Sequence, residues 1–332
     1  METFVLSMGE KSFRAKQLWS WIYQKGVTSF DEMTNIAKSF RLDLDQKAQI
    51  GSLDLLTQTN SRSSETRKYL WQLKDGLQVE SVFIPEQKRR TICISTQVGC
   101  AMGCRFCATG TMGFIRNLEP NEIVGQVLQV RRDIGQPTNL VIMGMGEPFM
   151  NYDNLLKALY IIKDGDGVAI GHRKITISTA GIVPRILQYT KERHPFLLAI
   201  SLNATTDEVR NEIMPINHKY PIAELLSAAK AYTQALKKRL TFEYVLIHGV
   251  NNSYQDAHRL MKLVKGIPCK INLIAYNTTT DLLKRPSDDQ VRKFAQWIEP
   301  MNVPITLRLS RGQDIDGACG QLVVKGLKGA KQ

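Results

Sequence analysis

TICISTQVGCAMGCRFCATGTMGF, residues 91–114, is the stretch that decides the fold. Its first five residues are mostly β-branched and predict a buried strand. Three cysteines follow in a CxxxCxxC arrangement: Cys100, Cys104 and Cys107. In parallel α/β folds the residues that follow a strand lie at the carboxyl edge of the sheet, where working sites are built. The three thiols are therefore expected to converge at such an edge.

Strand and helix patterns alternate from this stretch to the C-terminus. Six more strand-like runs follow it, at 139–143, 174–178, 197–201, 241–247, 270–275 and 305–309. Segments of helical length and period lie between most of them, such as 119–134, 153–164, 223–236 and 287–299. Repeated βα units predict a parallel sheet, either open and wound or curved into a full or partial barrel.

The chain before residue 91 has a different character. Residues 10–46 have apolar side chains at helical spacing and predict a small helical module. A polar, serine-rich loop at 60–68 precedes two strand-like runs that meet at Asp75-Gly76. This arrangement predicts a β-hairpin.

The charge balance indicates a polyanionic partner. Lys and Arg total 44 against 31 Asp and Glu, which leaves a formal net charge of +13 and a pI of about 9.5. RNA, DNA or an anionic membrane would fit such an excess. The chain has no apolar run of about 18 residues that could cross a membrane, and its first residues lack the pattern of a signal peptide. We therefore expect a cytoplasmic protein with no membrane partner.

The cysteines predict metal chemistry. Four of the six fall between Cys93 and Cys107, which indicates a metal or catalytic site rather than a disulfide framework. Three closely spaced thiolates suit a 4Fe–4S cluster that keeps one iron free of protein ligands. Zinc would need a second CxxC pair or two histidines nearby. A zinc site or a chance group of buried cysteines is the alternative.

The cysteine loop resembles the signature of the radical S-adenosylmethionine (SAM) superfamily, in which an aromatic residue, here Phe106, precedes the third cysteine. The resemblance implies an α/β fold built as a partial (β/α)6 barrel. It also implies that the free iron binds the amino and carboxylate groups of SAM. An electron from a donor such as a flavodoxin or ferredoxin would then cleave SAM to a 5′-deoxyadenosyl radical.

Six stretches are similar to the RlmN family of dual-specificity RNA adenine methyltransferases: QVGCAMGCRFCATGTMGFIRNL, VIMGMGEPFMNYDN, RKITISTAGIVPRI, SLNATTDEVRNEIMPINHKYP, PCKINLIAYN and RGQDIDGACGQL. The likeness covers nearly the whole chain. It implies methylation of adenine carbon 2 in 23S ribosomal RNA, at the peptidyl transferase centre, and in transfer RNA, beside the anticodon. A related enzyme that methylates carbon 8 is one alternative. An RNA-binding protein with a structural cluster is the non-catalytic one.

The resemblance assigns roles to particular residues. Cys100, Cys104 and Cys107 would hold the cluster. SAM contacts are implied for residues that follow successive strands: Gly146, Glu147, Ser178, Ser201, Leu202, Asn203 and Asn277. Taken alone, each of these would be an ordinary turn or cap residue.

Two cysteines outside the loop match reactive positions of the family. By resemblance, Cys319 receives a methyl group from one SAM, and the radical from a second SAM removes hydrogen from that group. The resulting methylene radical would add to the adenine ring. Cys93 would resolve the bridged product through a transient disulfide with Cys319, and Glu80 would accept a proton from the ring. The sixth cysteine, Cys269, is expected to be a small buried hydrophobic residue.

We expect three parts in the chain: a helical RNA-binding accessory domain over 1–60, a linker and hairpin over 61–90, and a radical SAM core over 91–325. The protein is expected to act as a monomer. Basic residues that could contact phosphate groups gather at Lys88–Arg90, Arg105, Arg116, Arg131–Arg132, Lys237–Arg239 and the terminal LKGAKQ.

Overall fold

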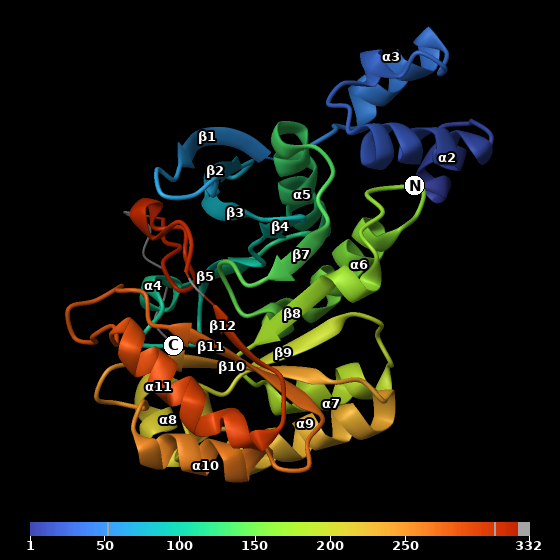
Figure 1. Ribbon diagram of the computed structural model, residues 1–332. Helices are drawn as coiled ribbons and strands as arrows, with labels where there is room; N and C mark the ends of the chain where they lie inside the picture. Colours follow the sequence, from blue (N-terminus) through green and yellow to red (C-terminus); the bar gives the residue numbers. More distant parts are fainter. Residues whose placement is uncertain (52, 309, 325–332) are drawn as a thin grey trace.

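One ten-stranded sheet forms the centre of the protein (Figure 1). The structure, a computed structural model, describes residues 1–51, 53–308 and 310–324. Seven neighbouring strands of the sheet are parallel: β4 (Arg89–Cys93), β7 (Asn139–Ile142), β8 (Ile175–Thr179), β9 (Leu197–Ser201), β10 (Leu240–Leu246), β11 (Cys269–Ala275) and β12 (Ile305–Arg308). Each predicted strand from residue 91 onward matches one of them to within two residues at either end. The predicted alternation is confirmed.

Helices join the parallel strands: α5 (Pro120–Ile134), α6 (Tyr152–Lys163), α7 (Val183–Lys191), α8 (Asp207–Ile213), α9 (Ile222–Leu236), α10 (Tyr254–Val264) and α11 (Asp288–Ile298). Figure 1 shows α7, α9, α10 and α11 along the lower side of the sheet. Within the described residues the outer strands of the sheet do not pair with each other, so the sheet stays open. The result is a partial barrel of six βα units, and β12 is its last strand.

Local sequence signals begin several of these helices. Ser253 begins α10, where its hydroxyl accepts a hydrogen bond from the Asp256 N–H at 3.1 Å. The Asp256 carboxylate in turn accepts from the Ser253 N–H, which completes a capping box. Ser287 and Gln290 repeat the arrangement at α11. Such pairs satisfy backbone donors that a helix start leaves free.

Three antiparallel strands extend the sheet beyond β4: β1 (Leu53–Asn60), β2 (Arg67–Leu73) and β3 (Gln78–Glu86). The predicted hairpin is β2 and β3, and Gly76 turns it with a φ of +82°. The third strand, β1, was not predicted. Only Leu53 of this edge strand is buried, so it lacks the alternation of apolar and polar residues that marks a strand.

A helical module precedes the sheet, as predicted for residues 10–46. Its elements are α1 (Glu2–Ser7), α2 (Phe13–Trp19), the π-helical turn η1 (Ser20–Lys25), the short η2 (Phe30–Glu32) and α3 (Lys38–Lys47). The module has its own apolar core, which includes Val5, Leu18, Met33, Phe40 and Leu44. Arg131 of α5 donates to the carbonyls of Tyr23 and Gln24 at the end of η1, at 3.0 and 2.8 Å. A cation beside free helix-end carbonyls ties the module to the core.

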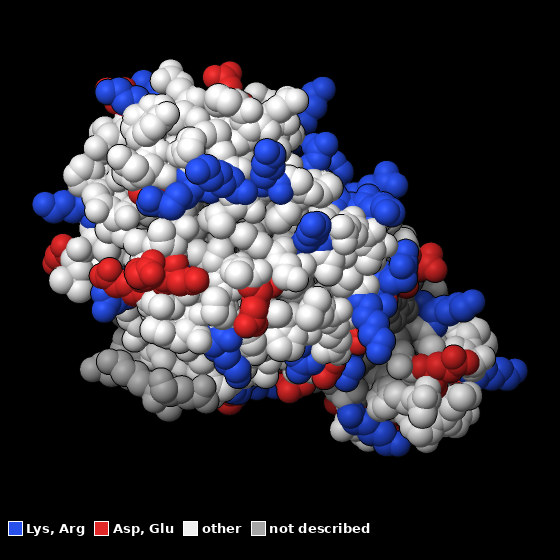
Figure 2. Space-filling model, turned by 90° about the horizontal axis from the view of Figure 1, so that it is seen from below, with Lys and Arg blue, Asp and Glu red and all other residues white. Residues whose placement is uncertain are grey.

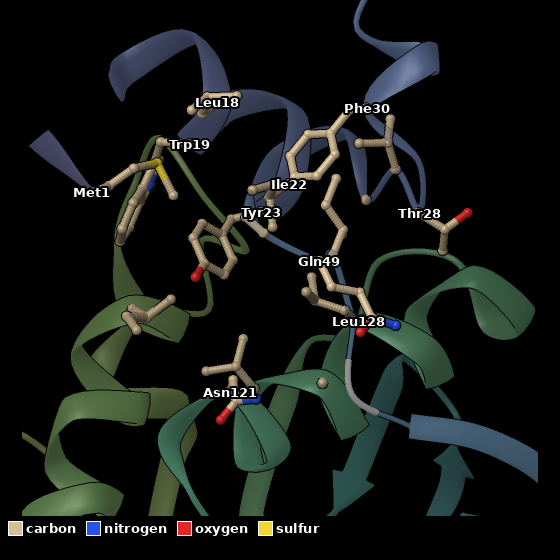
Figure 3. A pocket seen from close by; sticks show the side chains of 18 of the residues that line it. Met1, Leu18, Trp19, Ile22, Tyr23, Thr28, Phe30, Gln49, Asn121 and Leu128 are labelled. Atoms are coloured by element: carbon tan, nitrogen blue, oxygen red, sulfur yellow. The ribbon is translucent and has the colours of Figure 1, made fainter. Parts of the chain in front are cut away.

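A cavity of about 440 Å³ lies where this module meets α5 and α6 (Figure 3). Trp19, Ile22 and Tyr23 line it from the module, and Leu128 lines it from α5. Its described walls contain no cysteine and no carboxylate. The cavity therefore lacks the thiols and carboxylates that the expected chemistry needs. None of the described helices is long and apolar enough to cross a bilayer.

Candidate active site

The three clustered cysteines lie on the loop between β5 (Gln97–Cys100) and β6 (Gly113–Asn117), a small antiparallel pair. Gly99 in β5 has a φ of +74°, and a Cβ atom there would lie 1.9 Å from the Gly113 carbonyl oxygen. Only glycine therefore allows the two strands to approach so closely. The short helix α4 (Ala108–Met112) follows, and the Cys107 N–H donates to the Cys104 carbonyl at 3.1 Å. The thiols of Cys100, Cys104 and Cys107 line one cavity, as expected from their spacing.

Burial keeps these thiols neutral in the absence of a bound cation. It raises the pKa of Cys100 to about 12 and also raises the pKa values of Cys104 and Cys107. Neighbouring thiols add to the effect for Cys104. A metal centre that binds thiolates would replace these protons and so remove the cost of charging buried sulfur.

The chemistry of the three thiols, all on one cavity, fits a cluster. Within the described part of the chain no three Cys, His, Asp or Glu side chains are grouped closely enough to hold one metal ion. A tetrahedral zinc site needs its ligands at about 2.0–2.3 Å from one centre. A cubane binds each thiolate at a different iron and so needs them further apart.

The same cavity extends over the carboxyl ends of β7 to β11. Six of the seven expected SAM-contact residues line it: Gly146, Glu147, Ser178, Ser201, Asn203 and Asn277. The seventh, Leu202, is fully buried behind the lining, where its N–H donates to the Glu243 carbonyl at 3.0 Å. The structure thus brings the expected contacts together from the ends of four strands: β7, β8, β9 and β11.

Three hydrogen bonds from neighbouring residues hold the Glu147 carboxylate in place. One carboxylate oxygen accepts from the Phe149 N–H at 2.9 Å and from the Thr179 hydroxyl at 2.7 Å. The other accepts from the Ala180 N–H at 2.7 Å and keeps a further lone pair. Burial raises the pKa of this carboxyl group, although the hydrogen bonds oppose the shift. A cationic ligand in the cavity would favour its ionised form.

A second carboxylate lines the cavity and was not predicted. Glu243 lies on β10 and accepts a hydrogen bond from the Ser178 hydroxyl at 2.7 Å. Its neighbours in sequence are apolar, so only the fold reveals that it faces the site. Two buried carboxylates, Glu147 and Glu243, make the cavity suitable for a positively charged ligand.

Arg210 was also not predicted. It lies behind the lining of the cavity and fixes the backbone there. This fully buried side chain donates to the carbonyls of Ala180 at 2.8 Å, Ser201 at 3.0 Å and Leu202 at 3.0 Å. It also donates to the Asn217 side-chain oxygen at 3.0 Å. Burial lowers the pKa of Arg210 to about 10, which leaves it charged at neutral pH. One cation therefore holds the ends of β8 and β9 together.

Cys319 reaches the cavity from the C-terminal segment. The Asn277 side chain donates to the Cys319 carbonyl at 2.9 Å, and the Ala108 N–H donates to the Gly320 carbonyl at 2.7 Å. The Thr109 hydroxyl donates to the Leu322 carbonyl at 2.6 Å. The segment is thus bonded directly to the helix that follows the cysteine loop.

The antiparallel extension holds the other side of this segment. Asp314 accepts from the Ser61 hydroxyl at 2.8 Å and from the Arg62 N–H at 2.7 Å. Glu80 of β3 is buried, accepts from the Val323 N–H at 3.0 Å and pairs with Lys68 at 3.0 Å. Burial raises the pKa of Glu80, although Lys68 opposes the shift. Glu80 does not line the cavity itself; the structure places it against the backbone just beyond Cys319.

Cys93 ends β4 and lies within electrostatic range of Cys319. Burial raises its pKa to about 12, and Cys319 adds to the shift. Arg308 of β12 is close to both: Cys319 is the main cause of the raised pKa of its guanidinium, with Glu243 and Cys93 contributing. The guanidinium opposes the rise in the pKa of Cys93.

The disulfide expected between Cys93 and Cys319 is not present. All six cysteines are free thiols, so the structure does not support a resident disulfide. Cys93 is buried, whereas Cys319 is partly exposed and lines the cavity. Cys269 is buried on β11, as expected for a small hydrophobic residue.

Two family models match the chain. Residues 94–261 match the radical SAM superfamily, and residues 1–50 match the N-terminal domain of ribosomal RNA large subunit methyltransferases. The first match spans the cysteine loop and the strands up to α10. The second coincides with the helical module.

Curated relatives and a solved structure match nearly the whole chain. A "dual-specificity RNA methyltransferase RlmN" of Geobacter sulfurreducens is 48% identical over 97% of this chain and 89% of its own length. A Myxococcus xanthus relative named RlmN 2 is 48% identical over 96% of this chain and 86% of its own. The crystal structure of a radical SAM methyltransferase from Sphaerobacter thermophilus superposes with a TM-score of 0.93, at 40% identity, over 97% of this chain and 96% of that one. The chain therefore belongs to the RlmN family of dual-specificity RNA methyltransferases, within the radical SAM superfamily.

Proposed function

We propose that this protein methylates carbon 2 of an adenine in 23S ribosomal RNA and in transfer RNA, with Cys319 as carrier of the one-carbon unit. One observation carries the proposal: Cys319, from the far end of the chain, lines the same cavity as Cys100, Cys104 and Cys107. Such an adenine carbon lies between two nitrogens and is electron-poor. It cannot readily attack a methyl donor, so a carbon radical held on sulfur is the suitable reagent.

The cysteine loop holds one 4Fe–4S cluster in this proposal, and the cavity beside it holds SAM. The three buried thiols and two lining carboxylates have the chemistry that such a pair requires. When bound, the two groups supply a 5′-deoxyadenosyl radical, and SAM also supplies a methyl group. An electron donor of the flavodoxin or ferredoxin class would reduce the cluster, and a monomer would be the active unit.

Residues around the cavity orient the cofactor. The free lone pair of Glu147 is placed to accept a hydrogen bond from an ammonium group. Glu243, held by Ser178, adds a second negative charge near the positive sulfonium. The side chains of Ser201, Asn203 and Asn277 form the polar rim, although Asn277 also holds the Cys319 carbonyl. Cofactor binding and carrier placement are thereby linked through one amide.

The carrier sulfur depends on its neighbours. The thiolate of Cys319 is the form that would attack a methyl donor, and Arg308 is its charged neighbour. Cys93, beside it, is the group that would release the methylated product from Cys319. Glu80 lies just behind the segment and would accept the proton that the ring loses. The raised pKa of its carboxyl group, caused by burial, suits a proton acceptor that works near neutral pH.

Two alanine variants test this division of labour. Cys319→Ala should form no methylated adenine, because no sulfur remains to carry the carbon. Cys93→Ala should complete addition to the ring and leave RNA covalently attached to the protein. A denaturing gel with labelled RNA should show a slow-migrating species for Cys93→Ala alone. Cys269→Ala, which removes a buried thiol distant from the cavity, is the matched control and should behave as the unmodified protein.

Normal turnover by Cys319→Ala would show that the carbon does not pass through that sulfur, and the proposal would have to be abandoned. Mass spectrometry of the modified nucleoside separates carbon 2 from carbon 8 methylation. Carbon 8 product alone would move the chain to the alternative reaction. SAM cleavage without any methylated RNA would leave only the cluster assignment standing.

A further inference from the structure

Most of the basic groups expected at an RNA interface are engaged within the protein. Arg116 pairs with Asp75 and Glu122 at 2.7 and 2.8 Å. Arg105 pairs with Glu212 at 3.0 Å, while Arg131 and Arg132 hold the helical module. The terminal LKGAKQ lies outside the described residues. The runs at residues 88–90 and 237–239 are different: among the described residues, neither has a carboxylate within 4.0 Å. The second run is the one with further cations beside it.

This run belongs to a larger basic group at the amino edge of the sheet. The connections that lead into β8, β9 and β10, together with Lys191 at the end of α7, carry seven cations, here called the basic rim: Arg173, Lys174, Lys191, Arg193, Lys237, Lys238 and Arg239. The three strands are neighbours in the sheet, and they begin within two residues of one another in register: Thr176 pairs with Leu197, and Thr241 pairs with Ala199. Their connections therefore end side by side.

Contacts within the rim confirm that it is one surface. The Lys238 ammonium donates to the Pro195 carbonyl, in the connection before β9, at 2.9 Å. Burial, and the positive charge of Arg173 from the connection before β8, lower the pKa of Lys238. Six of the seven side chains are exposed, and Lys238 is half-buried. Figure 2 shows Lys and Arg side chains gathered toward the right-hand edge of this face, on the side where Figure 1 places α7.

No ion pair among the described residues neutralises a cation of the rim. None of its seven cations has a carboxylate within 4.0 Å in the described structure, whereas Arg67, Arg259 and Arg292 elsewhere on the surface each do. Glu192 lies in the same connection as Arg193, but Tyr152, Gln188 and His194 occupy its carboxylate.

The acidic residues of the connection before β8 lie on another side. Asp164 and Asp166 precede Gly167, which packs against Tyr23 of the helical module: a Cβ at Gly167 would lie 3.2 Å from the Tyr23 Cβ. This part of the connection therefore faces the module, while Arg173 and Lys174 come at its end. Like charges held together without counterions are unfavourable unless a polyanion neutralises them.

We propose that the basic rim binds the phosphate backbone of the substrate RNA at a segment away from the reacting adenine. The inference rests on the proposed function, which supplies RNA as the substrate. Strands of five to seven residues, at about 3.3 Å each, separate the rim from the cavity by about 15–25 Å. A folded RNA spans such a distance. An acidic redox protein docked on the rim would lie at the amino edge of the sheet, whereas the cluster lies at the carboxyl edge.

Four substitutions test the rim without disturbing a hydrogen bond. Arg173→Gln, Lys191→Gln, Lys237→Gln and Arg239→Gln are combined, because these exposed side chains make no hydrogen bond to any residue that the structure describes. The matched control removes four exposed lysines from the outer faces of α6, α9, α10 and α11: Lys157, Lys230, Lys262 and Lys293. Both variants lose the same charge, so any difference reports position.

Binding is measured with a full-length transfer RNA transcript and with its isolated anticodon stem–loop, over a range of salt concentrations. The rim variant should bind the full-length transcript about tenfold more weakly at moderate salt. The slope of log affinity against log salt should fall by about one for each phosphate group that the variant no longer binds. Its affinity for the stem–loop should match that of the control. A 23S ribosomal RNA fragment gives the same comparison for the second substrate.

Equal losses of affinity in the rim and control variants would show a general charge effect and overturn the inference. Unchanged RNA affinity, with slower turnover only when a flavodoxin replaces dithionite as reductant, would assign the rim to a redox protein instead. The proposed function would fail on a separate result: RNA treated with the unmodified protein would contain no methylated adenine. Binding and product formation are thus read independently.

Discussion

The cysteine loop and the Cys319 segment meet at one cavity but are held there in different ways. The loop is stabilised locally, by the β5–β6 ladder and by the bond from the Cys107 N–H to the Cys104 carbonyl. The Cys319 segment, over the described residues 310–324, has a single short helical turn, η7 (Gln313–Ile315). It depends on bonds from distant parts of the chain, including Ser61, Thr109 and Asn277.

This difference separates a part that sequence spacing encodes from a part that only the whole fold can place. A segment with few regular backbone bonds also opens more easily than one inside a ladder. Such freedom suits a carrier, which must meet first a methyl donor and then an RNA base. We therefore expect changes in the cysteine loop to abolish SAM cleavage. Changes in the Cys319 segment should instead reduce the amount of RNA that is methylated for each SAM cleaved.

The largest effect is expected from the loop itself. Replacement of Cys100, Cys104 or Cys107 by Ala should abolish SAM cleavage, because a cluster with only two protein ligands is lost or inactive. The measurements are iron content and 5′-deoxyadenosine release after anaerobic reconstitution. Cys269→Ala, at a buried thiol outside the cavity, is the control and should retain both. Full cleavage with zinc as the only bound metal would contradict the cluster assignment.

Much of the core could be predicted from sequence because its signals are local. The strand runs from residue 91 onward alternate with helical periods, and the CxxxCxxC spacing follows the first of them directly. The edge strand β1 could not be predicted, because it is mostly exposed and its register shifts between Leu55 and Thr57. Its burial pattern therefore never reaches the alternation that marks a strand.

The residues that sequence reasoning missed act through tertiary contacts. Arg210 lies in a polar helix and reads as a surface residue, yet the fold buries it under three carbonyls. Asp314 reads as part of a turn, and its partners Ser61 and Arg62 come from the first part of the chain. Family resemblance identified Cys319 but gave no information on what holds it in place.

The second largest effect concerns the support beneath the cofactor cradle. Arg210→Met should destabilise the protein by more than about 3 kcal/mol, since each buried acceptor left without a donor costs about 1–3 kcal/mol. Urea unfolding followed by circular dichroism measures the change. Arg292→Met, which breaks an exposed pair with Asp289, should cost less than about 1 kcal/mol. Equal costs for the two variants would show that the cradle does not depend on Arg210.

An intermediate effect is expected where the Cys319 segment meets the antiparallel extension. Asp314→Ala removes the acceptor for Ser61 and Arg62, so Cys319 should lose its fixed position while the cluster stays intact. SAM cleavage should continue, but methylated RNA per cleaved SAM should fall about tenfold, because small misplacements of a reacting group are costly. Chromatography of both products in one reaction gives the ratio. Loss of cleavage and methylation in parallel would mean that Asp314 supports the whole site.

The smallest effect is expected from an exposed ion pair on the cysteine loop, which is the counterpart of the Asp314 contacts on the Cys319 segment. Arg105, next to Cys104, pairs with Glu212 at 3.0 Å, and both side chains are more than half exposed. Water and salt screen such a pair, which stabilises a protein by about 0–1 kcal/mol. Arg105→Gln should therefore leave iron content, dithionite-driven SAM cleavage and the ratio of methylation to cleavage unchanged. If Arg105→Gln lowered that ratio as far as Asp314→Ala does, the loop would depend on outside ties as much as the carrier segment. The contrast between a locally built cluster site and a tethered carrier would then be wrong.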